Sequence, residues 1–294
     1  MTPTDNSEGI RGSELLLNPN GSIYHLYLRP EQVADRVIIV GDPGRVAAIS
    51  ANFDTVEHVV ENREFVTHTG TFNGKRVTAL STGIGTDNID IVLNELDALV
   101  NVNFETRMPN DTKRSLSIIR IGTTGALQGN IPVNSFIVSA YGLGMDGLLH
   151  HYKNDICETA IENAFLQQVQ LSDHLPRPYV VKGSQRLIDS IGADMYLGMT
   201  ATAAGFYAPQ GRMLRLPLAN PHMVDQMTEF KFEGLKVTNF EMETSAFYGL
   251  GQLLGHDCCT VCVAIANRVN QTYNEHYKEY VAQLISLVLK RLTS

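Results

Sequence analysis

The sequence lacks the features that direct a protein to membranes or to nucleic acids. It carries 23 Lys and Arg against 31 Asp and Glu, and this formal net charge of −8 provides no basic surface for nucleic acid or an anionic membrane. No uninterrupted apolar stretch reaches about 18 residues, which excludes a transmembrane helix. The first twenty residues contain only LLL as an apolar run, too short for the core of a signal peptide. We therefore expect a cytoplasmic protein without nucleic-acid or membrane partners.

Cysteine is also scarce, and its spacing does not indicate a metal site. Among the four cysteines, Cys259 and Cys262 have the C-x-x-C spacing of some zinc and redox sites. They lie in CCTVCVAIA, which predicts a buried strand, and an offset of three on a strand sends two side chains to opposite faces. No second Cys or His pair follows at metal spacing. We expect these thiols to be structural.

Short β-branched runs alternate with helical patterns along the chain. Strands are predicted at 36–42, 115–126 and 258–266, and amphipathic helices at 87–101 and 273–292. Strands interleaved with helices in this way predict an α/β fold in which helices cover both faces of a sheet.

One domain accounts for most of the chain, which has no internal repeat and no low-complexity segment. The first residues are polar and interrupted by Gly, Asn and Pro, so we expect a loose segment at 1–22 before a domain at 23–294. The stretch FETRMPNDTKRS, 104–115, is polar and lies between a helix and a strand. It is predicted to be an insertion within the domain.

Two segments carry the residue types of an anion site. In VGDPGRV a predicted strand ends at Gly41 and a helix opens beside Arg45, so backbone N–H groups and a guanidinium come together. No Gly-Lys-Ser/Thr follows, so this is not a P-loop. In IIRIGTTGA, Arg120 and Thr123 lie where a strand ends, and ligands bind beyond such ends in α/β sheets. A phosphate site is indicated, although an ordinary β–α turn and a structural ion pair for Arg120 stay open.

Two further segments suit a nucleoside. In FYAPQGR, Phe206 offers a stacking face, while Gln210 and Arg212 offer donors and an acceptor for a flat heterocycle. In NFEMET, one carboxylate of Glu241 or Glu243 could accept both hydroxyls of a ribose. A surface loop for the first segment and a pair of acids at a helix N-terminus for the second stay open as plainer explanations. GIGTDN lacks the third glycine of a dinucleotide-binding motif.

In this order the segments YHLYL, VGDPGRV, NREF, STGIG, IRIGTTGALQ, FYAPQGR, NFEMETSA and IANR resemble the nucleoside phosphorylase superfamily, and within it the branch that acts on uridine. The resemblance runs from about residue 23 to the C-terminal helix. It implies a single-domain, three-layer α/β/α fold with a mixed central sheet.

The resemblance also implies roles for individual residues. Phosphate would be bound by Gly41, Arg45, Arg120, Thr123 and, from a neighbouring subunit, Arg63. The ribose would be bound by Met242, Glu243 and the neighbouring subunit's His25, and the base by Phe206, Gln210, Arg212 and Glu241, with Arg268 supporting the pocket.

The implied reaction is the phosphorolysis of a nucleoside, with inorganic phosphate as co-substrate and no metal or organic cofactor. A monovalent cation near Glu64 is left open, because Asn88 stands where the family carries a Ser that helps to hold it. The implied assembly is a homo-oligomer with a dimer as its unit, and a hexamer is left open. The chain has Asn267 and Arg268 where the purine branch carries an acid, which disfavours a purine nucleoside phosphorylase. A hydrolytic nucleosidase and a non-catalytic nucleoside-binding protein also stay open.

Overall fold

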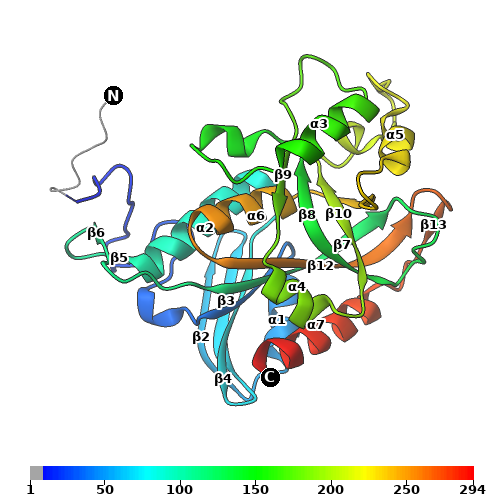
Figure 1. Ribbon diagram of the computed structural model, residues 1–294. Helices are drawn as coiled ribbons and strands as arrows, with labels where there is room; N and C mark the ends of the chain where they lie inside the picture. Colours follow the sequence, from blue (N-terminus) through cyan, green and yellow to red (C-terminus); the bar gives the residue numbers. More distant parts are fainter. Residues whose placement is uncertain (1–8) are drawn as a thin grey trace.

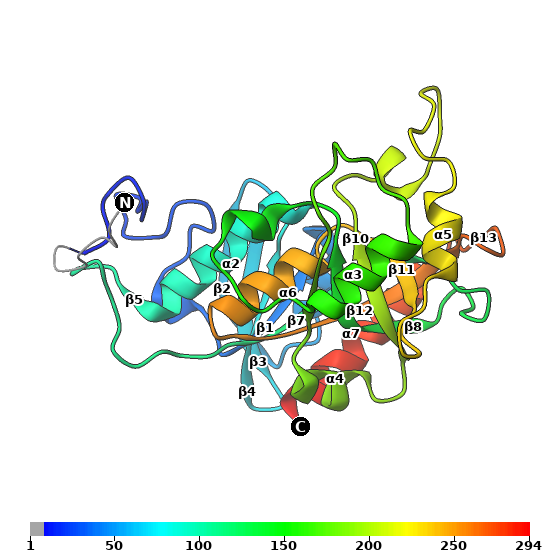
Figure 2. The same cartoon turned by 45° about the horizontal axis from the view of Figure 1, so that its top comes forward.

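The computed structural model describes residues 9–294 as one mixed sheet with helices on both faces, which confirms the expected single-domain α/β/α fold (Figure 1). Two helices, α2 (Thr86–Asn101) and α6 (Thr244–Leu253), pack together on one face. The helices α1 (Gly44–Ser50), α4 (Gln185–Gly192) and α7 (Lys278–Thr293) cover the other face. Two more helices, α3 (Thr159–Gln168) and α5 (Met223–Glu229), form a third group, which Figure 2 shows beside β10 and β11.

The main sheet has eleven strands, and part of it closes on itself. Its order is β13-β12-β8-β10-β11-β7-β1-β4-β3-β2, with β9 paired to β8, and β12 also pairs with β7. The strands β7, β12, β8, β10 and β11 therefore form a closed ring, from which β1, β4, β3 and β2 extend as an open sheet. The bounds are β1 Arg36–Val40, β2 Thr55–Asn62, β3 Phe65–Phe72, β4 Lys75–Ser81, β7 Ser117–Ala126, β8 Phe136–Gly144, β9 Tyr179–Lys182, β10 Tyr196–Thr202, β11 Val237–Glu241, β12 Asp257–Asn267 and β13 Thr272–Tyr273.

The sequence pattern explains the central strands and the long helices. In β1, β7 and β12 almost every residue is buried, because both faces of these strands are covered. In α2 the buried positions Ile89, Val92, Leu93 and Leu96 repeat at helical spacing, as predicted. The helix begins one residue earlier than expected, at Thr86, so Asp87 lies in its first turn.

The start of the C-terminal helix was predicted wrongly, and the strand β2 was not predicted. The C-terminal helix begins at Lys278, because Thr272 and Tyr273 pair with β12 as the short strand β13. The strand β2 has no counterpart in the predictions. It is an edge strand whose side chains are mostly exposed, so it lacks the regular alternation that marks a half-buried strand.

The N-terminal segment and the 104–115 insertion lie against each other. The insertion follows β5 (Val102–Asn103) and contains the turn and the second strand, β6 (Met108–Pro109), of a small hairpin. Arg107, in the left-handed backbone region at φ 58°, donates to the carbonyls of Ile10 (2.7 Å), Arg11 (3.1 Å) and Leu15. Of the expected loose segment 1–22, residues 1–8 lie outside the described residues, and residues 9–22 carry these contacts.

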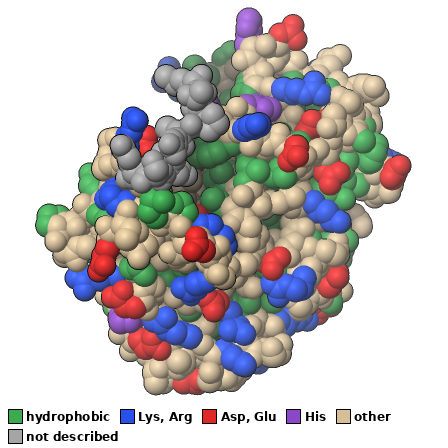
Figure 3. Space-filling model, turned by 60° about the vertical axis from the view of Figure 1, so that its left-hand side comes forward, with side chains coloured by type: hydrophobic (Ala, Val, Ile, Leu, Met, Phe, Trp, Pro, Cys, Tyr) green, Lys and Arg blue, Asp and Glu red, His purple; other side chains and the backbone are tan. Residues whose placement is uncertain are grey.

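The surface and the thiols agree with the composition. On the face in Figure 3, basic and acidic side chains are interspersed. Three of the four cysteines are buried and all four are free, and burial raises the pKa of Cys262 to about 12. Across residues 9–294, no cluster of three His, Cys, Asp or Glu could hold a metal ion. Within the same range no helix is long and apolar enough to cross a membrane.

Replacing Arg107 by Ala is expected to release the segment around Ile10 to Leu15. The variant loses three bonds from a charged donor to carbonyls, so the free energy of unfolding should fall by about 2 kcal/mol. Limited trypsin digestion should cleave after Arg11 faster than in the wild type. The control is Glu105→Ala, an exposed change on the same hairpin, and equal cleavage rates in the two variants would contradict the anchoring role.

Candidate active site

A cavity of about 720 Å³ lies where the loops after β1, β4 and β10 meet the C-terminal halves of β7 and β12 and the junction of β11 with α6. It brings together most residues that the sequence singled out. Those in its lining are Gly41, Arg45, Arg120, Thr123, Phe206, Gln210, Arg212, Glu241, Met242, Glu243 and Arg268. These residues come from segments spread over more than two hundred positions of the chain, so their convergence in one cavity was the least predictable part of the site.

The inner wall of the cavity is a buried group of three charges, Arg120, Glu241 and Glu243. Nη1 of Arg120 lies 3.1 Å from Oε2 of Glu241, and Nη2 of Arg120 donates to Oε2 of Glu243. Burial opposes the charge of Arg120, but Glu243 and Glu241 outweigh it and raise the pKa of the guanidinium above its ordinary value. Arg120 is therefore permanently charged, and both of its terminal nitrogens face carboxylates.

Nε of Arg120 is a donor without a partner. It is fully buried and makes no hydrogen bond with the residues that the structure describes. A buried donor on a charged group is costly unless a ligand accepts from it. Gly122 allows this position, since a Cβ there would lie 2.5 Å from Nη1 of Arg120 and 2.9 Å from Sγ of Cys262. Arg120 lines the cavity, so its positive charge acts on a ligand there, although Nε itself is buried away from the cavity surface.

The two glutamates have different partners. Both oxygens of Glu241 are occupied within the protein, by Thr202 Oγ1 (2.7 Å) and by the backbone N–H groups of Glu243 (3.0 Å) and Thr244 (2.9 Å), in addition to Arg120. Glu241 therefore holds the first turn of α6 and Arg120, and it also lines the cavity, where the resemblance implies a contact with the base. Within residues 9–294, Glu243 accepts from Gly85 N–H (2.9 Å) and Arg120 alone, so lone pairs are left for a ligand. Burial raises the pKa of Glu243, Arg120 opposes that rise and Glu241 adds to it.

Arg45 and the turn before α1 form a second basic point of the cavity. Asp42 Oδ1 accepts from Gly44 N–H (2.9 Å) and fixes the turn, and its Oδ2 lies 4.0 Å from Nε of Arg45. The Arg45 side chain is mostly buried, whereas the Asp42 side chain is mostly exposed. The exposed carboxylate is hydrated, so it only weakly neutralises the guanidinium.

The opposite end of the cavity joins an aromatic ring to two guanidinium groups. Arg212 lies 3.9 Å from the ring centroid of Phe206 and donates to Oε1 of Gln210 (2.5 Å), while Arg268 donates to the Gln210 carbonyl (3.0 Å). Burial, together with the nearby charge of Arg268, lowers the pKa of Arg212 to about 10. A flat ligand with electron-rich carbonyl edges would offset this crowding of positive charge.

The chain matches one protein family over most of its length, since a profile of the phosphorylase superfamily covers residues 35–293. The chain belongs to the phosphorylase superfamily. Uridine phosphorylase of Escherichia coli is 30% identical over 258 residues, which cover 85% of this chain and 87% of that protein. Uridine phosphorylase of Thermococcus kodakarensis is 28% identical over 275 residues, covering 92% and 87%. A Trypanosoma brucei nucleoside phosphorylase, whose crystal structure is described as showing uridine phosphorylase activity, matches with a TM-score of 0.86 and 29% identity, covering 95% of this chain and 99% of that one.

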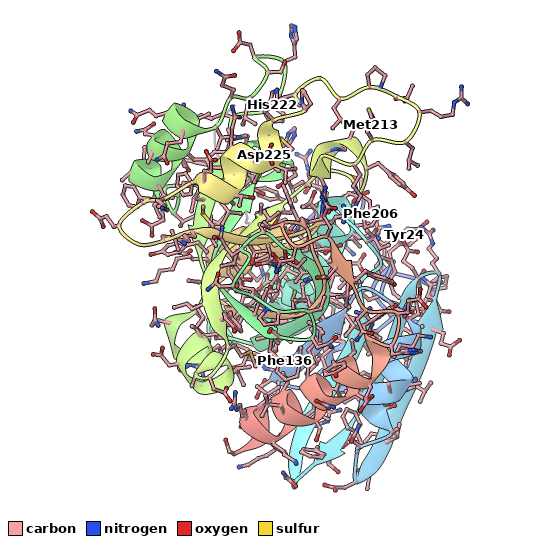
Figure 4. All side chains as sticks on the ribbon, turned by 90° about the vertical axis from the view of Figure 1, so that its right-hand side faces the viewer. Tyr24, Phe136, Phe206, Met213, His222 and Asp225 are labelled. Atoms are coloured by element: carbon pink, nitrogen blue, oxygen red, sulfur yellow. The ribbon has the colours of Figure 1, made fainter. Side chains whose placement is uncertain are left out.

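Three residues that the superfamily resemblance singled out lie outside the lining of this cavity: His25, Arg63 and Glu64. His25 and Arg63 share one surface, because the Arg63 guanidinium lies 5.6 Å from the ring centroid of Tyr24, and the Tyr24 ring meets His25 edge-on at 4.8 Å. Figure 4 shows Tyr24 and Phe206 toward the same edge of the molecule. Glu64 lies beside Asn88, since a Cβ on Gly83 would be 3.2 Å from one side chain and 2.3 Å from the other.

Two further cavity residues of this phosphorylase superfamily member are Thr124 and Tyr273. Thr124, next to the predicted Thr123, donates to the Phe240 carbonyl (2.5 Å) and accepts from Asn239 (2.8 Å), so its hydroxyl is committed to the protein. Tyr273 lines the cavity from β13 because the β12–β13 hairpin folds back, and the sequence pattern had assigned it to a helix. The motif IIRIGTTGA offers the hydroxyl of Thr124, like that of Thr123, as a donor to a ligand, but the protein itself uses the Thr124 hydroxyl.

Replacing Glu241 by Ala is expected to lower the free energy of unfolding by about 3–5 kcal/mol. The change leaves Arg120 buried with one carboxylate instead of two, and it removes the acceptor for the first N–H groups of α6. Urea unfolding at neutral pH measures the difference. In contrast, Glu57→Ala removes a half-exposed pair with Arg76 and should cost at most about 1 kcal/mol. Equal losses of unfolding free energy in the two variants would show that the buried contact of Glu241 with Arg120 stabilises the protein no more than the half-exposed pair of Glu57 with Arg76.

Proposed function

We propose that this protein is a uridine phosphorylase, which catalyses the reversible phosphorolysis of uridine to uracil and ribose 1-phosphate. The observation that carries the proposal is that groups suited to an anion, a ribose and a heterocycle line one cavity. The guanidinium groups of Arg45 and Arg120 suit an anion, and Gln210 and Arg212 suit a heterocycle. Glu243, whose carboxylate suits a ribose, lines the same cavity. The activities named for the curated relatives support the same function.

The chemistry follows from these positions. A phosphate oxygen forms a bond to C1′ while the bond from C1′ to N1 of the base breaks, and the electron pair of that bond passes to uracil. Arg45 and Arg120 orient the phosphate beside the positive charge that develops on the sugar. Glu243 accepts from the ribose hydroxyls, with Met242 against the sugar. Gln210 and Arg212 stabilise the negative charge on uracil until a proton is taken up, and Phe206 stacks on the ring.

A purine leaving group is disfavoured because no acid faces the base from the end of β12. Asn267 donates to the carbonyls of Gln128 (2.9 Å) and Ile131 (2.8 Å), and its Oδ1 accepts from Val269 N–H (2.9 Å). Its amide therefore holds a turn, and Arg268, which follows it, supports Gln210. A hydrolytic nucleosidase would leave Arg45 and Arg120 without an anion.

Further parts of the proposal concern assembly and context. We propose a homo-oligomer with a dimer as its unit and leave a hexamer open, with His25 and Arg63 reaching the ribose and phosphate of a neighbouring subunit. Asn88 lies beside Glu64, and whether a monovalent cation binds at this position stays open. A role in pyrimidine salvage in the cytoplasm completes the proposal.

Uracil release from uridine tests the function directly. The purified protein is assayed with phosphate and in phosphate-free buffer, with inosine in parallel. We expect uracil only when phosphate is present, and little cleavage of inosine. Equal release without phosphate would indicate a hydrolase, faster cleavage of inosine would indicate a purine enzyme, and no release would indicate a binding protein.

Replacing Arg212 by Ala is expected to lower kcat/KM for uridine on the order of 100-fold, because one directed donor to the developing negative charge is lost. The matched control is Arg215→Ala, since Arg215 is an exposed arginine on the same loop and does not line the cavity. Steady-state kinetics at saturating phosphate measure both variants. The base-reading role is wrong if the two arginine variants lose activity equally.

A further inference from the structure

The imidazole of His25 is held in one orientation by a residue that no motif indicated, Glu95 of α2. Nδ1 of His25 lies 2.7 Å from Oε1 of Glu95. The same carboxylate accepts the backbone N–H groups of His25 (3.0 Å) and Leu26 (2.8 Å). On the other side, Asn62 donates to the His25 carbonyl (2.7 Å). Both the backbone and the ring of His25 are therefore fixed.

This contact also determines which ring nitrogen carries the proton. An ionised carboxylate can only accept hydrogen bonds, so Nδ1 of His25 must donate to Glu95. The neutral ring then presents Nε2 as an acceptor. Nε2 makes no hydrogen bond within residues 9–294, and the His25 side chain is 25% exposed, so this acceptor is available at the surface.

The backbone around His25 is constrained, and the His25 side chain is partly exposed at the surface. The next turn contains Tyr27 with φ 58°, and Arg63 on the same surface has φ 56°. Both are non-glycine residues in the left-handed region, a conformation that the surrounding contacts must maintain. Neither His25 nor Glu95 lines the cavity of its own chain. A nucleoside in the cavity of the same chain is thus not the partner of Nε2, whereas a second copy of the chain, as in the proposed assembly, could bring one to this surface.

We propose that Glu95 is a positioning residue: it keeps His25 as the Nδ1–H tautomer, with Nε2 directed at the 5′-hydroxyl of a nucleoside bound in a second copy of the chain. This inference rests on the proposed function. Glu95 acts only through His25, so its effect depends on whether the substrate has a 5′-hydroxyl.

The test compares Glu95→Gln with His25→Ala on two substrates, uridine and 5′-deoxyuridine. The Gln oxygen can still accept from the backbone N–H groups, but its amide nitrogen cannot accept from Nδ1. Loss of the hydrogen bond that the 5′-hydroxyl donates to Nε2 predicts a fall in kcat/KM for uridine on the order of 10-fold in both variants. With 5′-deoxyuridine both variants should match the wild type. Asp90→Asn is the control, because Asp90 on the same helix contacts Tyr152 and Asn94 instead.

A second measurement does not depend on turnover. Nitrogen-15 NMR of the histidines should assign the Nδ1–H tautomer to His25 in the wild type and its loss in Glu95→Gln. An Nε2–H tautomer in the wild type would overturn the inference, as would an equal fall with both substrates or no fall with either. Absence of phosphate-dependent uracil release by the wild type would instead reject the proposed function, whatever the tautomer.

Discussion

Arg120 is a full charge buried in the centre of the protein, and the site is built around that constraint. A guanidinium removed from water needs carboxylates and hydrogen-bond acceptors close to it. Glu241 and Glu243 supply them from the junction of β11 and α6, and each is tied to a further element, through Thr202 in β10 and Gly85 before α2. One ion group thus fixes the relative positions of β7, β10, β11, α6 and the start of α2.

The closed ring of strands brings the remaining parts of the cavity to the same end of the molecule. Because β11 pairs with both β10 and β7, and β7 with β12, the loops that carry the base-reading and charged residues open side by side. Inside the ring a buried chain of hydrogen bonds runs from Ser139 through Thr200 and Asn239 to Thr124. These polar groups are paired with one another, so they specify the strand register instead of weakening the core.

The residues of the cavity were predictable because each sits in a short motif whose chemistry is local. A strand end with Arg, or a loop with Gln and Arg, can be recognised within ten residues. The role of Glu241 could not be recognised in this way, since its partner Thr202 lies 39 positions away and Arg120 even further. The hydrogen bond between His25 and Glu95 likewise joins residues 70 positions apart in the chain. The fold class and most elements followed from periodicity, whereas β2, the ring closure and the contact of Arg107 with the N-terminal segment depend on tertiary pairing.

The turn after β12 bears on how readily this scaffold could change its substrate. Asn267 uses its amide as both donor and acceptor, and it joins the Gln128 and Ile131 carbonyls to the N–H groups of Val269 and Asn270. A carboxylate at this position could satisfy the N–H groups but would repel both carbonyls. An acid at this position, suited to a purine base, would therefore also need a second substitution that gives the carbonyls of Gln128 and Ile131 a new hydrogen-bond donor. More than one mutation thus separates specificity for uridine from specificity for a purine nucleoside.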